Sequence, residues 1–301
     1  MRIGLFTDGL AHRALSDVLE WLAAELPEVR DLEIGTGGYS PSPHANLAEL
    51  LRSRDARKRL RSEIEARGFR LVALNISGNP LEVDEHDRAL VDTIRLAALL
   101  GVDRVVCMSG GRAELAGAGW FPGLEEEIHR YWSGRVLPYW ETTSALAREA
   151  HEGLRLCFEL EPGAAVFNVS TFERLAELGT NLAVNLDPSH FFWQGIDPLA
   201  AIRRLGHRIA FAHGKDTVLA PELIAIDGVI DRTTWRYATV GRGRDQSWWR
   251  AFAQELHGVG YEGVVSVEYE DPAVPPESSI VEGVRTLQRA LAAPAPAEVS
   301  G

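Results

Sequence analysis

Four short apolar runs in the second half of the chain each end at a side chain that can bind a metal ion. The side chains that follow these runs are Glu159, Asp187, His213 and Glu268. If the runs are neighbouring strands of a parallel barrel, their carboxyl ends meet at one rim and surround one point. Crowded carboxylates are unfavourable unless a cation neutralises them. Three carboxylates and one imidazole therefore predict a site for a hard divalent ion such as Mn²⁺ or Mg²⁺, with a structural ion-pair network as the alternative.

Apolar runs and amphipathic segments alternate along the whole chain. Strands are expected at residues 3–7, 32–34, 71–74, 104–108, 156–159, 182–187, 209–213 and 264–267. Eight strands alternating with helices predict a single (β/α)8 TIM barrel, an α/β fold. An open, doubly wound sheet is the competing architecture, but no Gly-x-Gly-x-x-Gly follows the first strand. We expect one catalytic domain over residues 1–291 and a disordered Ala/Pro-rich tail over residues 292–301.

Several local signals predict where helices begin. One charged, amphipathic helix is expected over residues 46–67, and Asp84 is expected to cap the next one. Ser170-Thr171-Phe172-Glu173 has the spacing of a capping box, and Asp197-Pro198 combines an N-cap with a first-turn proline. A long loop is expected after His213, and it is followed by a helix that carries Trp249, Phe252 and Leu256 and ends near Gly258.

Composition limits the possible partners and locations. The 301 residues carry a net charge of −12, which opposes binding to nucleic acid or to an anionic membrane. The only cysteines, Cys107 and Cys157, fall within predicted strands, as expected for buried thiols in a reducing cytoplasm. The first apolar run stops before Asp8, too early for a signal peptide, and no run is long enough to span a membrane.

Longer motifs surround the four candidate ligands. They are Phe158-Glu159-Leu160-Glu161-Pro162, Asp187-Pro188-Ser189-His190, His213-Gly214-Lys215-Asp216 and Val267-Glu268. In order and placement these motifs resemble those of the xylose isomerase-like TIM barrels, in the branch of sugar phosphate isomerases and epimerases. The resemblance implies one divalent ion, with Mn²⁺ expected and Mg²⁺, Co²⁺ or Zn²⁺ as alternatives. It implies that Glu159, Asp187, His213 and Glu268 hold this ion, and that Glu159 and Glu268 also exchange protons with the substrate.

The same resemblance assigns three residues to substrate binding. His190 matches a histidine that hydrogen-bonds the substrate, with a structural histidine as the alternative. Lys215 is expected to stabilise developing charge or to pair with Asp216, and Arg236 to reach substrate oxygens or to anchor its loop. Glu161 departs from the pattern, because related sequences often carry a histidine there.

Two tryptophans offer an apolar surface for a sugar ring. Trp120 and Trp193 are expected either to cover the ring or to pack in the core.

The expected activity is isomerisation or epimerisation of a sugar, keto-sugar or related polyol through an enediolate. The alternative is a metal-dependent lyase on the same scaffold, such as an inosose-type dehydratase or the subunit of a C-glycoside deglycosidase acting on a 3-keto-sugar. An apurinic endonuclease is disfavoured, since the second and third strands end without a histidine. A non-catalytic binding protein is disfavoured because all four ligand positions are filled. The expected partner is a small carbohydrate, and a homo-oligomer or a hetero-subunit remains open.

Overall fold

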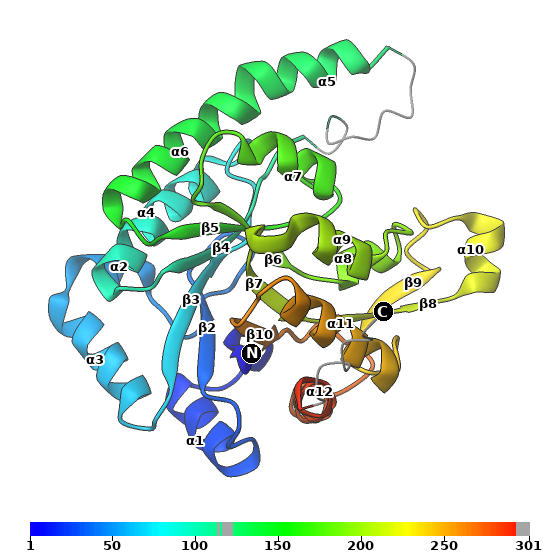
Figure 1. Cartoon of the computed structure of the whole chain (residues 1–301). Coiled ribbons are helices and arrows are strands. Elements are labelled where there is room, and N and C mark those ends of the chain that lie inside the picture. The colour runs from blue at the N-terminus through cyan, green and yellow to red at the C-terminus, as the bar shows by residue number, and fades with distance from the viewer. Residues whose placement is uncertain (113–114, 116–122, 293–301) are drawn as a thin grey trace, which may run out of the picture.

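Eight parallel strands close into a barrel in the order β1-β10-β7-β6-β5-β4-β3-β2 (Figure 1). The computed structural model describes residues 1–112, 115 and 123–292. The barrel strands are β1 (Arg2–Phe6), β2 (Asp31–Gly35), β3 (Arg70–Ile76), β4 (Arg104–Met108), β5 (Arg155–Glu159), β6 (Leu182–Leu186), β7 (Ile209–Gly214) and β10 (Val264–Val267). The closed barrel with its surrounding helices confirms the predicted (β/α)8 fold.

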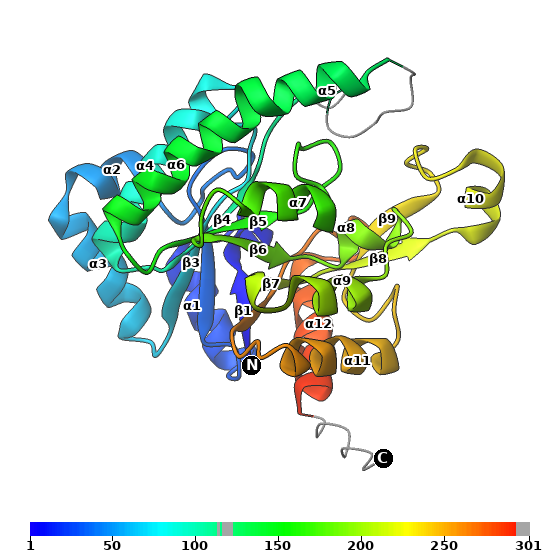
Figure 2. The same ribbon diagram turned by 45° about the horizontal axis from the view of Figure 1, so that its top comes forward.

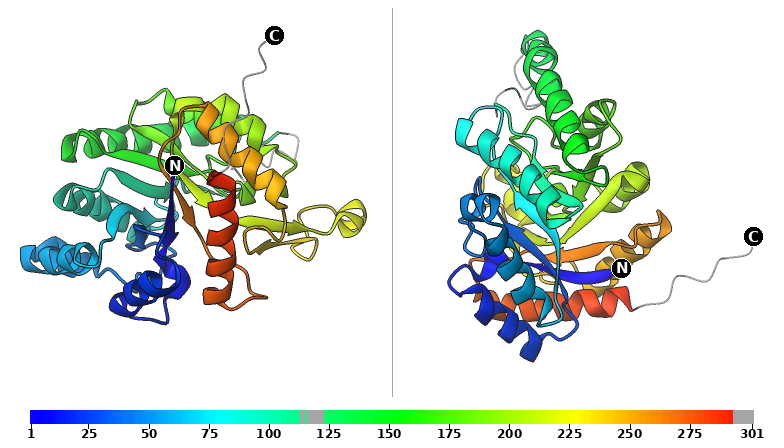
Figure 3. Two further views of the ribbon diagram at one scale, coloured as in Figure 1. Left: turned by 60° about the horizontal axis from the view of Figure 1, so that its bottom comes forward. Right: turned by 90° about the vertical axis from the view of Figure 1, so that its left-hand side faces the viewer.

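Helices surround the barrel, and most of them bury an apolar face against it (Figures 2 and 3). They are α1 (Leu15–Glu25), α2 (Leu47–Arg52), α3 (Arg54–Glu65), α4 (Asp84–Leu100), α5 (Glu125–Tyr131), α6 (Leu137–Ala150), α7 (Val169–Ala176), α8 (Ser189–Phe192), α9 (Pro198–Leu205), α10 (Pro221–Asp227), α11 (Gln246–Gly258) and α12 (Pro276–Leu291). Short 3-10 turns form at η1 (Thr7–Leu10) and η4 (Gly206–Arg208), and a π-helical segment, η3 (Trp132–Val136), joins α5 to α6. In α12 the helical spacing of Ile280, Val284 and Leu287 puts all three in the core. None of the described helices is long and apolar enough to cross a membrane.

The inside of the barrel is layered, and this layering positions the site. An apolar layer consists of Ala73, Val106, Cys157, Ala183, Phe211 and Val264. Because side chains alternate along a strand, residues two positions further on point the same way. Glu159 therefore follows Cys157, and His213 follows Phe211, one step closer to the carboxyl rim. The alternation of side chains along the strands thus places polar side chains inside the barrel, between the apolar layer and the carboxyl rim.

Both cysteines are buried and free, as predicted. Trp120 and the tail from residue 293 onward lie outside the described residues.

Three predicted helix starts differ from the structure. The helix expected over residues 46–67 is divided at Ser53, whose hydroxyl accepts a hydrogen bond from the Ala56 amide and starts α3. Asp84 is the first residue of α4 and makes no capping hydrogen bond, so its prediction as a cap was wrong. At α7 the capping box is formed by Asn168 and Thr171 and does not begin at Ser170. The Asp197 cap is confirmed, since its carboxylate accepts from the Leu199 amide.

The stretch after β7 contains regular structure where a loop was expected. Strands β8 (Asp216–Leu219) and β9 (Trp235–Ala238) pair antiparallel, and α10 lies between them at the tip of a projecting arm (yellow in Figure 1). The arm is anchored at its base, where the Thr217 hydroxyl donates to the Ser189 carbonyl and Trp235 stacks on Trp193 with ring centroids 4.5 Å apart. Trp193 thus packs against the arm, which is one of the two roles expected for it.

The capping box of α7 gives a stability test. Asn168→Ala removes the side chain that accepts from the Thr171 amide, so we expect a loss of about 1 kcal/mol of unfolding free energy. Ser170→Ala, in the same first turn but exposed and outside the box, is the matched control and should change stability by less than about 0.5 kcal/mol. Urea unfolding measures both. Equal losses in the two variants would contradict the assignment of Asn168 as the cap.

Candidate metal centre

The four predicted ligands lie together at the carboxyl rim of the barrel. Glu159 is the last residue of β5, Asp187 follows β6, His213 lies in β7 and Glu268 follows β10. One ligand atom from each lies within 4.8 Å of the others. Glu159, Asp187 and His213 are buried and Glu268 is nearly so. The barrel therefore gathers side chains that are up to 109 positions apart, from Glu159 to Glu268, into one cluster.

The chemistry of this cluster fits a divalent cation. Among the described residues, Asp187 Oδ2 and Glu268 Oε2 are buried and accept no hydrogen bond of normal geometry, although His213 and Lys215 form ion pairs with both. Buried carboxylate oxygens without a full set of hydrogen bonds are costly unless another partner satisfies them. Three carboxylates with one imidazole form a donor set suited to Mn²⁺, Mg²⁺ or a related ion. The orphaned atoms and the donor types agree, so we assign this cluster as the candidate metal centre.

Neighbouring charges control the protonation of the cluster. Burial raises the pKa of Glu159, and the charge of Glu268 acts in the same direction, with partial compensation from His190. Burial also opposes charge on Glu268, but Lys215 and His213 outweigh it and lower its pKa to about 2. Burial disfavours the charged form of His213, yet the adjacent carboxylates Glu33 and Glu268 raise its pKa well above the usual range.

Two of the three predicted substrate-binding residues line the cavity beside the cluster. His190 Nε2 lies 2.7 Å from Glu159 Oε1, and its Nδ1 lies 3.0 Å from the hydroxyl of Tyr237. Lys215 Nζ lies 3.2 Å from Glu268 Oε2 and 2.8 Å from Glu270 Oε2, above the ring of Tyr237. Lys215 pairs with these glutamates. Asp216 instead accepts hydrogen bonds from the amides of a following loop.

The third, Arg236, has a different position. It lies on β9 with its side chain 46% exposed and its Nη1 3.2 Å from Asp271 Oδ1. The lining of the cavity includes the neighbouring Tyr237 but not Arg236.

Reasoning from the sequence missed Glu33 and Asp8. Glu33 lies inside the barrel on β2, is fully buried, and has His213, Asn75 and Ser266 around its carboxylate. The available signal was one charged residue between Leu32 and Ile34 in an apolar strand. Asp8 lines the cavity and accepts a very short hydrogen bond from Ser40. Burial, opposed by this hydrogen bond, raises the pKa of Asp8 to about 6.

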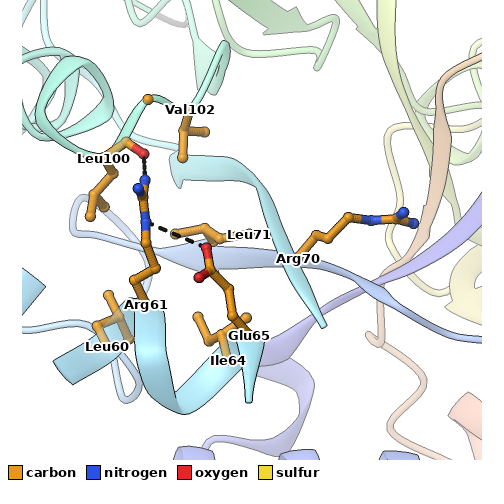
Figure 4. Close-up of a pocket in the computed structure, with 9 residues that line it drawn as sticks. Leu60, Arg61, Ile64, Glu65, Arg70, Leu71, Leu100 and Val102 are labelled. Atoms are coloured by element: carbon orange, nitrogen blue, oxygen red, sulfur yellow. Dashed lines mark hydrogen bonds and ion pairs between the residues drawn. The ribbon is translucent and has the colours of Figure 1, made fainter. Parts of the chain in front are cut away.

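A cavity of about 710 Å³ opens above the cluster, which is within the range of small-molecule sites. A smaller hollow of about 280 Å³ lies at the other end of the barrel, between α3 and the start of β3 (Figure 4). In that hollow Arg61 donates to the Leu100 carbonyl and lies 3.6 Å from Glu65. Active sites of TIM barrels form at the carboxyl ends of the strands, so the larger cavity is the candidate substrate site.

Known proteins resemble this chain in sequence and in fold. A family model described as xylose isomerase-like TIM barrel matches residues 32–290. An uncharacterized protein of Bacillus subtilis (strain 168), YfiH, is 36% identical over 314 residues, covering 97% of this chain and 99% of that protein.

Solved structures share the architecture at low identity. The IolI protein with a bound zinc atom is 19% identical with a TM-score of 0.67, covering 96% of this chain and 96% of its own. L-ribulose 3-epimerase is 16% identical with a TM-score of 0.62, covering 96% and 94%. The probable 3-DHS dehydratase AsbF of Bacillus anthracis is 13% identical with a TM-score of 0.65, covering 95% and 97%. At these identities the likeness is one of fold.

The cluster predicts metal binding of defined stoichiometry. We expect elemental analysis after mild dialysis to find about one divalent ion per chain, with Mn²⁺ rebinding after chelation. His213→Ala should weaken binding at least about tenfold, because it removes a ligand from a carboxylate cluster. His257→Ala, an exposed histidine far from the cluster, is the control. A stoichiometry near zero with no rebinding of Mn²⁺, Mg²⁺, Co²⁺ or Zn²⁺ would contradict the assignment.

Proposed function

Because the chain belongs to the xylose isomerase-like TIM-barrel family, we propose that it is a divalent-metal-dependent isomerase or epimerase of a sugar, keto-sugar or related polyol. The reaction would pass through an enediolate of the substrate. The proposal includes a cytoplasmic enzyme acting on a small carbohydrate.

One observation carries the proposal: two glutamates flank the candidate metal centre. Glu159 and Glu268 belong to β5 and β10, the outer two of the four adjacent strands β5-β6-β7-β10. Two carboxylates that approach a reacting carbon from different sides can remove a proton on one face and return one on the other. This arrangement supports inversion at a carbon next to a carbonyl group. Return of the proton to the former carbonyl carbon gives an aldose–ketose isomerase.

Glu159, Asp187, His213 and Glu268 would hold the ion, for which Mn²⁺ is our first choice. A bound divalent ion supplies Lewis acidity, which acidifies the carbon-bound proton and stabilises the enediolate. The remaining roles belong to the chain. His190, hydrogen-bonded to Glu159, would orient that carboxylate and bind a substrate hydroxyl. Lys215 would balance the negative charge that develops beside Glu268.

Arg236 is proposed to act through the base of the arm. Its pairing with Asp271 orders the loop that carries Tyr269 and Glu270, both of which line the cavity.

A lyase is the second candidate. The hydroxyl of Tyr237 lies 3.0 Å from His190 Nδ1 at the wall of the cavity, where the pair could protonate a departing hydroxyl group. The same enediolate would then lose water, or release an aglycone from a 3-keto-glycoside. Product mass separates the reactions, because it is unchanged by an isomerase and lower by one water after dehydration.

Solvent exchange tests the proposed chemistry. With an active sugar in D₂O, we expect deuterium mainly in the product at the carbon next to the carbonyl group, because each face has its own carboxylate. Mass spectrometry and NMR locate the label. Turnover without any solvent deuterium would show a hydride shift within the substrate and would contradict the proton-transfer mechanism.

The two glutamates are tested by amide substitution. Glu268→Gln and Glu159→Gln keep an oxygen ligand but lose the base, so turnover should fall by at least about a hundredfold while metal is partly retained. Glu282→Gln, which changes a surface glutamate paired with Arg242, is the matched control and should retain activity. Rates close to wild type in either site variant would remove that residue from proton transfer.

A further inference from the structure

The cavity above the metal centre has an unusual balance of charge. Six carboxylates line it: Asp8, Glu159, Glu161, Glu268, Glu270 and Asp271. The cations in its lining are Lys215 and Arg232, with His190 beside them. Only Glu159 and Glu268 belong to the metal cluster, so a bound divalent ion leaves the other carboxylates in excess.

The two cations are poorly placed to bind an anion. Lys215 is 3% exposed and is surrounded by carboxylates of Asp187, Glu268 and Glu270 at 3.7, 3.2 and 2.8 Å. Arg232 is exposed, and its guanidinium stacks on the ring of Trp235 at 4.3 Å. Phosphate sites in proteins use arginine forks or the amide groups at a helix start. Among the described residues of the lining, neither feature is directed into this cavity.

The rest of the lining suits hydroxyl groups and sugar carbon faces. Ser40 and Ser77 offer hydroxyl groups on one side, and the Ser77 hydroxyl has no hydrogen-bond partner among the described residues. Tyr39 and Tyr269 offer aromatic faces, and free carboxylates accept hydrogen bonds from hydroxyl groups. Glu161 is half-buried in the lining, and its side chain has no hydrogen bond or ion pair among the described residues, so the carboxylate is free to accept a hydrogen bond.

From this balance we propose that the substrate is an uncharged polyhydroxylated compound, a free sugar or polyol that carries neither a phosphate nor a carboxylate. The inference rests on the proposed function, since it concerns the same site. A phosphate dianion placed in this cavity would meet the unpaired carboxylate of Glu161. The cations Lys215 and Arg236 are already paired with Glu270 and Asp271 and would not be free to compensate it. A neutral polyol meets the same carboxylate as a hydrogen-bond acceptor. Charge therefore selects against the phosphorylated sugars that many enzymes of carbohydrate metabolism use.

Matched pairs of probes test this selectivity. Isothermal titration of the Mn²⁺-loaded protein would compare D-fructose with D-fructose 6-phosphate, and myo-inositol with myo-inositol 1-phosphate. We expect the neutral member to bind at least about tenfold tighter, with a gap that narrows as ionic strength rises. Glu161→Gln should strengthen binding of the phosphorylated member severalfold and leave the neutral member within about threefold. Glu173→Gln, on the outer face of α7, is the control.

Each outcome bears on the inference. Equal or tighter binding of the phosphorylated probes overturns it, as does failure of every neutral probe to bind. The inference would also be overturned if Glu161→Gln left the ratio of the affinities for the neutral and the phosphorylated probe unchanged. Neutral probes that bind without turnover would contradict the proposed reaction and leave the substrate class standing. Turnover of a phosphorylated sugar by isomerisation or epimerisation would support the proposed reaction and contradict the proposed substrate class.

A separate observation concerns the imidazole of the cluster. Both carboxylate oxygens of Glu33 lie 3.1–3.2 Å from His213 Nε2, while His213 Nδ1 lies 2.9 Å from Glu268 Oε2 on the side of the cluster. Asn75 and Ser266 each donate to one oxygen of Glu33 at 2.8 Å and hold that carboxylate in place. The amide of Asn185 lies 3.2 and 3.3 Å from the two ring nitrogens, so it favours neither of them.

The geometry points to Glu33 as a positioning residue for the metal centre. A carboxylate that accepts the Nε2 proton keeps the Nδ1 lone pair directed at the cluster. His213 would thus be held in the one tautomer and orientation that can bind the ion. Glu33 acts through His213, and its other hydrogen-bond partners among the described residues are Asn75 and Ser266, not the remaining three candidate ligands.

Metal affinity tests this role. Glu33→Gln should weaken Mn²⁺ binding by about 10–100-fold in titration calorimetry. It should also change the visible spectrum of the Co²⁺-loaded protein, which a purely structural defect in a folded variant would leave intact. Glu255→Gln, which changes a glutamate on the outer side of α11 paired with Arg203, is the control and should shift affinity by less than about threefold. If Glu33→Gln does not fold, Glu33→Asp replaces it and should lose affinity through its shorter reach. A folded variant with affinity and spectrum close to wild type would overturn the assignment.

Discussion

The structure is arranged around buried negative charge that requires a cation. Asp187 and Glu159 have almost no exposure, and both approach His190 and the ligand atoms of the other strands. Burial of a carboxylate costs several kcal/mol unless charge or hydrogen bonds compensate it. Here two imidazoles and one lysine compensate part of the negative charge, and a bound divalent ion would compensate the rest. Such a cluster is poor design for stability alone, so it indicates a binding role.

Strand alternation explains why the cluster could be predicted from the sequence. Glu159, Asp187, His213 and Glu268 each stand where an apolar run ends, and a barrel brings adjacent strand ends together. This prediction does not depend on the conformation of the loops. The cap at Asp197 was equally local and was predicted correctly. Local sequence signals and the number of expected strands were therefore enough to predict the barrel fold and the four candidate ligands.

What escaped prediction depends on contacts between distant segments. Glu33 lies between two apolar residues, and its burial follows only from the closure of the barrel, which places its carboxylate beside His213 of β7 and Ser266 of β10 across the interior. The register shift between Leu32 and Glu33 in the pairing with β3 leaves no simple pattern in the sequence. The β8–β9 arm was missed because its strands are short and lie outside the barrel. At α7 the capping-box spacing pointed to Ser170, but the helix begins earlier, where Asn168 accepts a hydrogen bond from the Thr171 amide.

The two halves of the barrel contribute differently to the cavity. Strands β5, β6, β7 and β10 supply the ligand atoms, whereas β1 to β4 and the segments after them supply Phe6, Asp8, Ser40, Ser77 and Met108. In the metal half, which is formed by β5, β6, β7 and β10, each candidate ligand lies at or just after a strand end, so its chemistry can be inferred from the sequence spacing. The other half places its groups on segments whose paths depend on tertiary packing, and these groups line the part of the cavity away from the candidate ligands. Glu161 belongs to the metal half yet faces the cavity as an additional carboxylate. A histidine at this position could carry a positive charge towards an anionic group, and a glutamate cannot. One departure from the common motif thus changes the charge presented to the substrate while leaving the metal cluster intact.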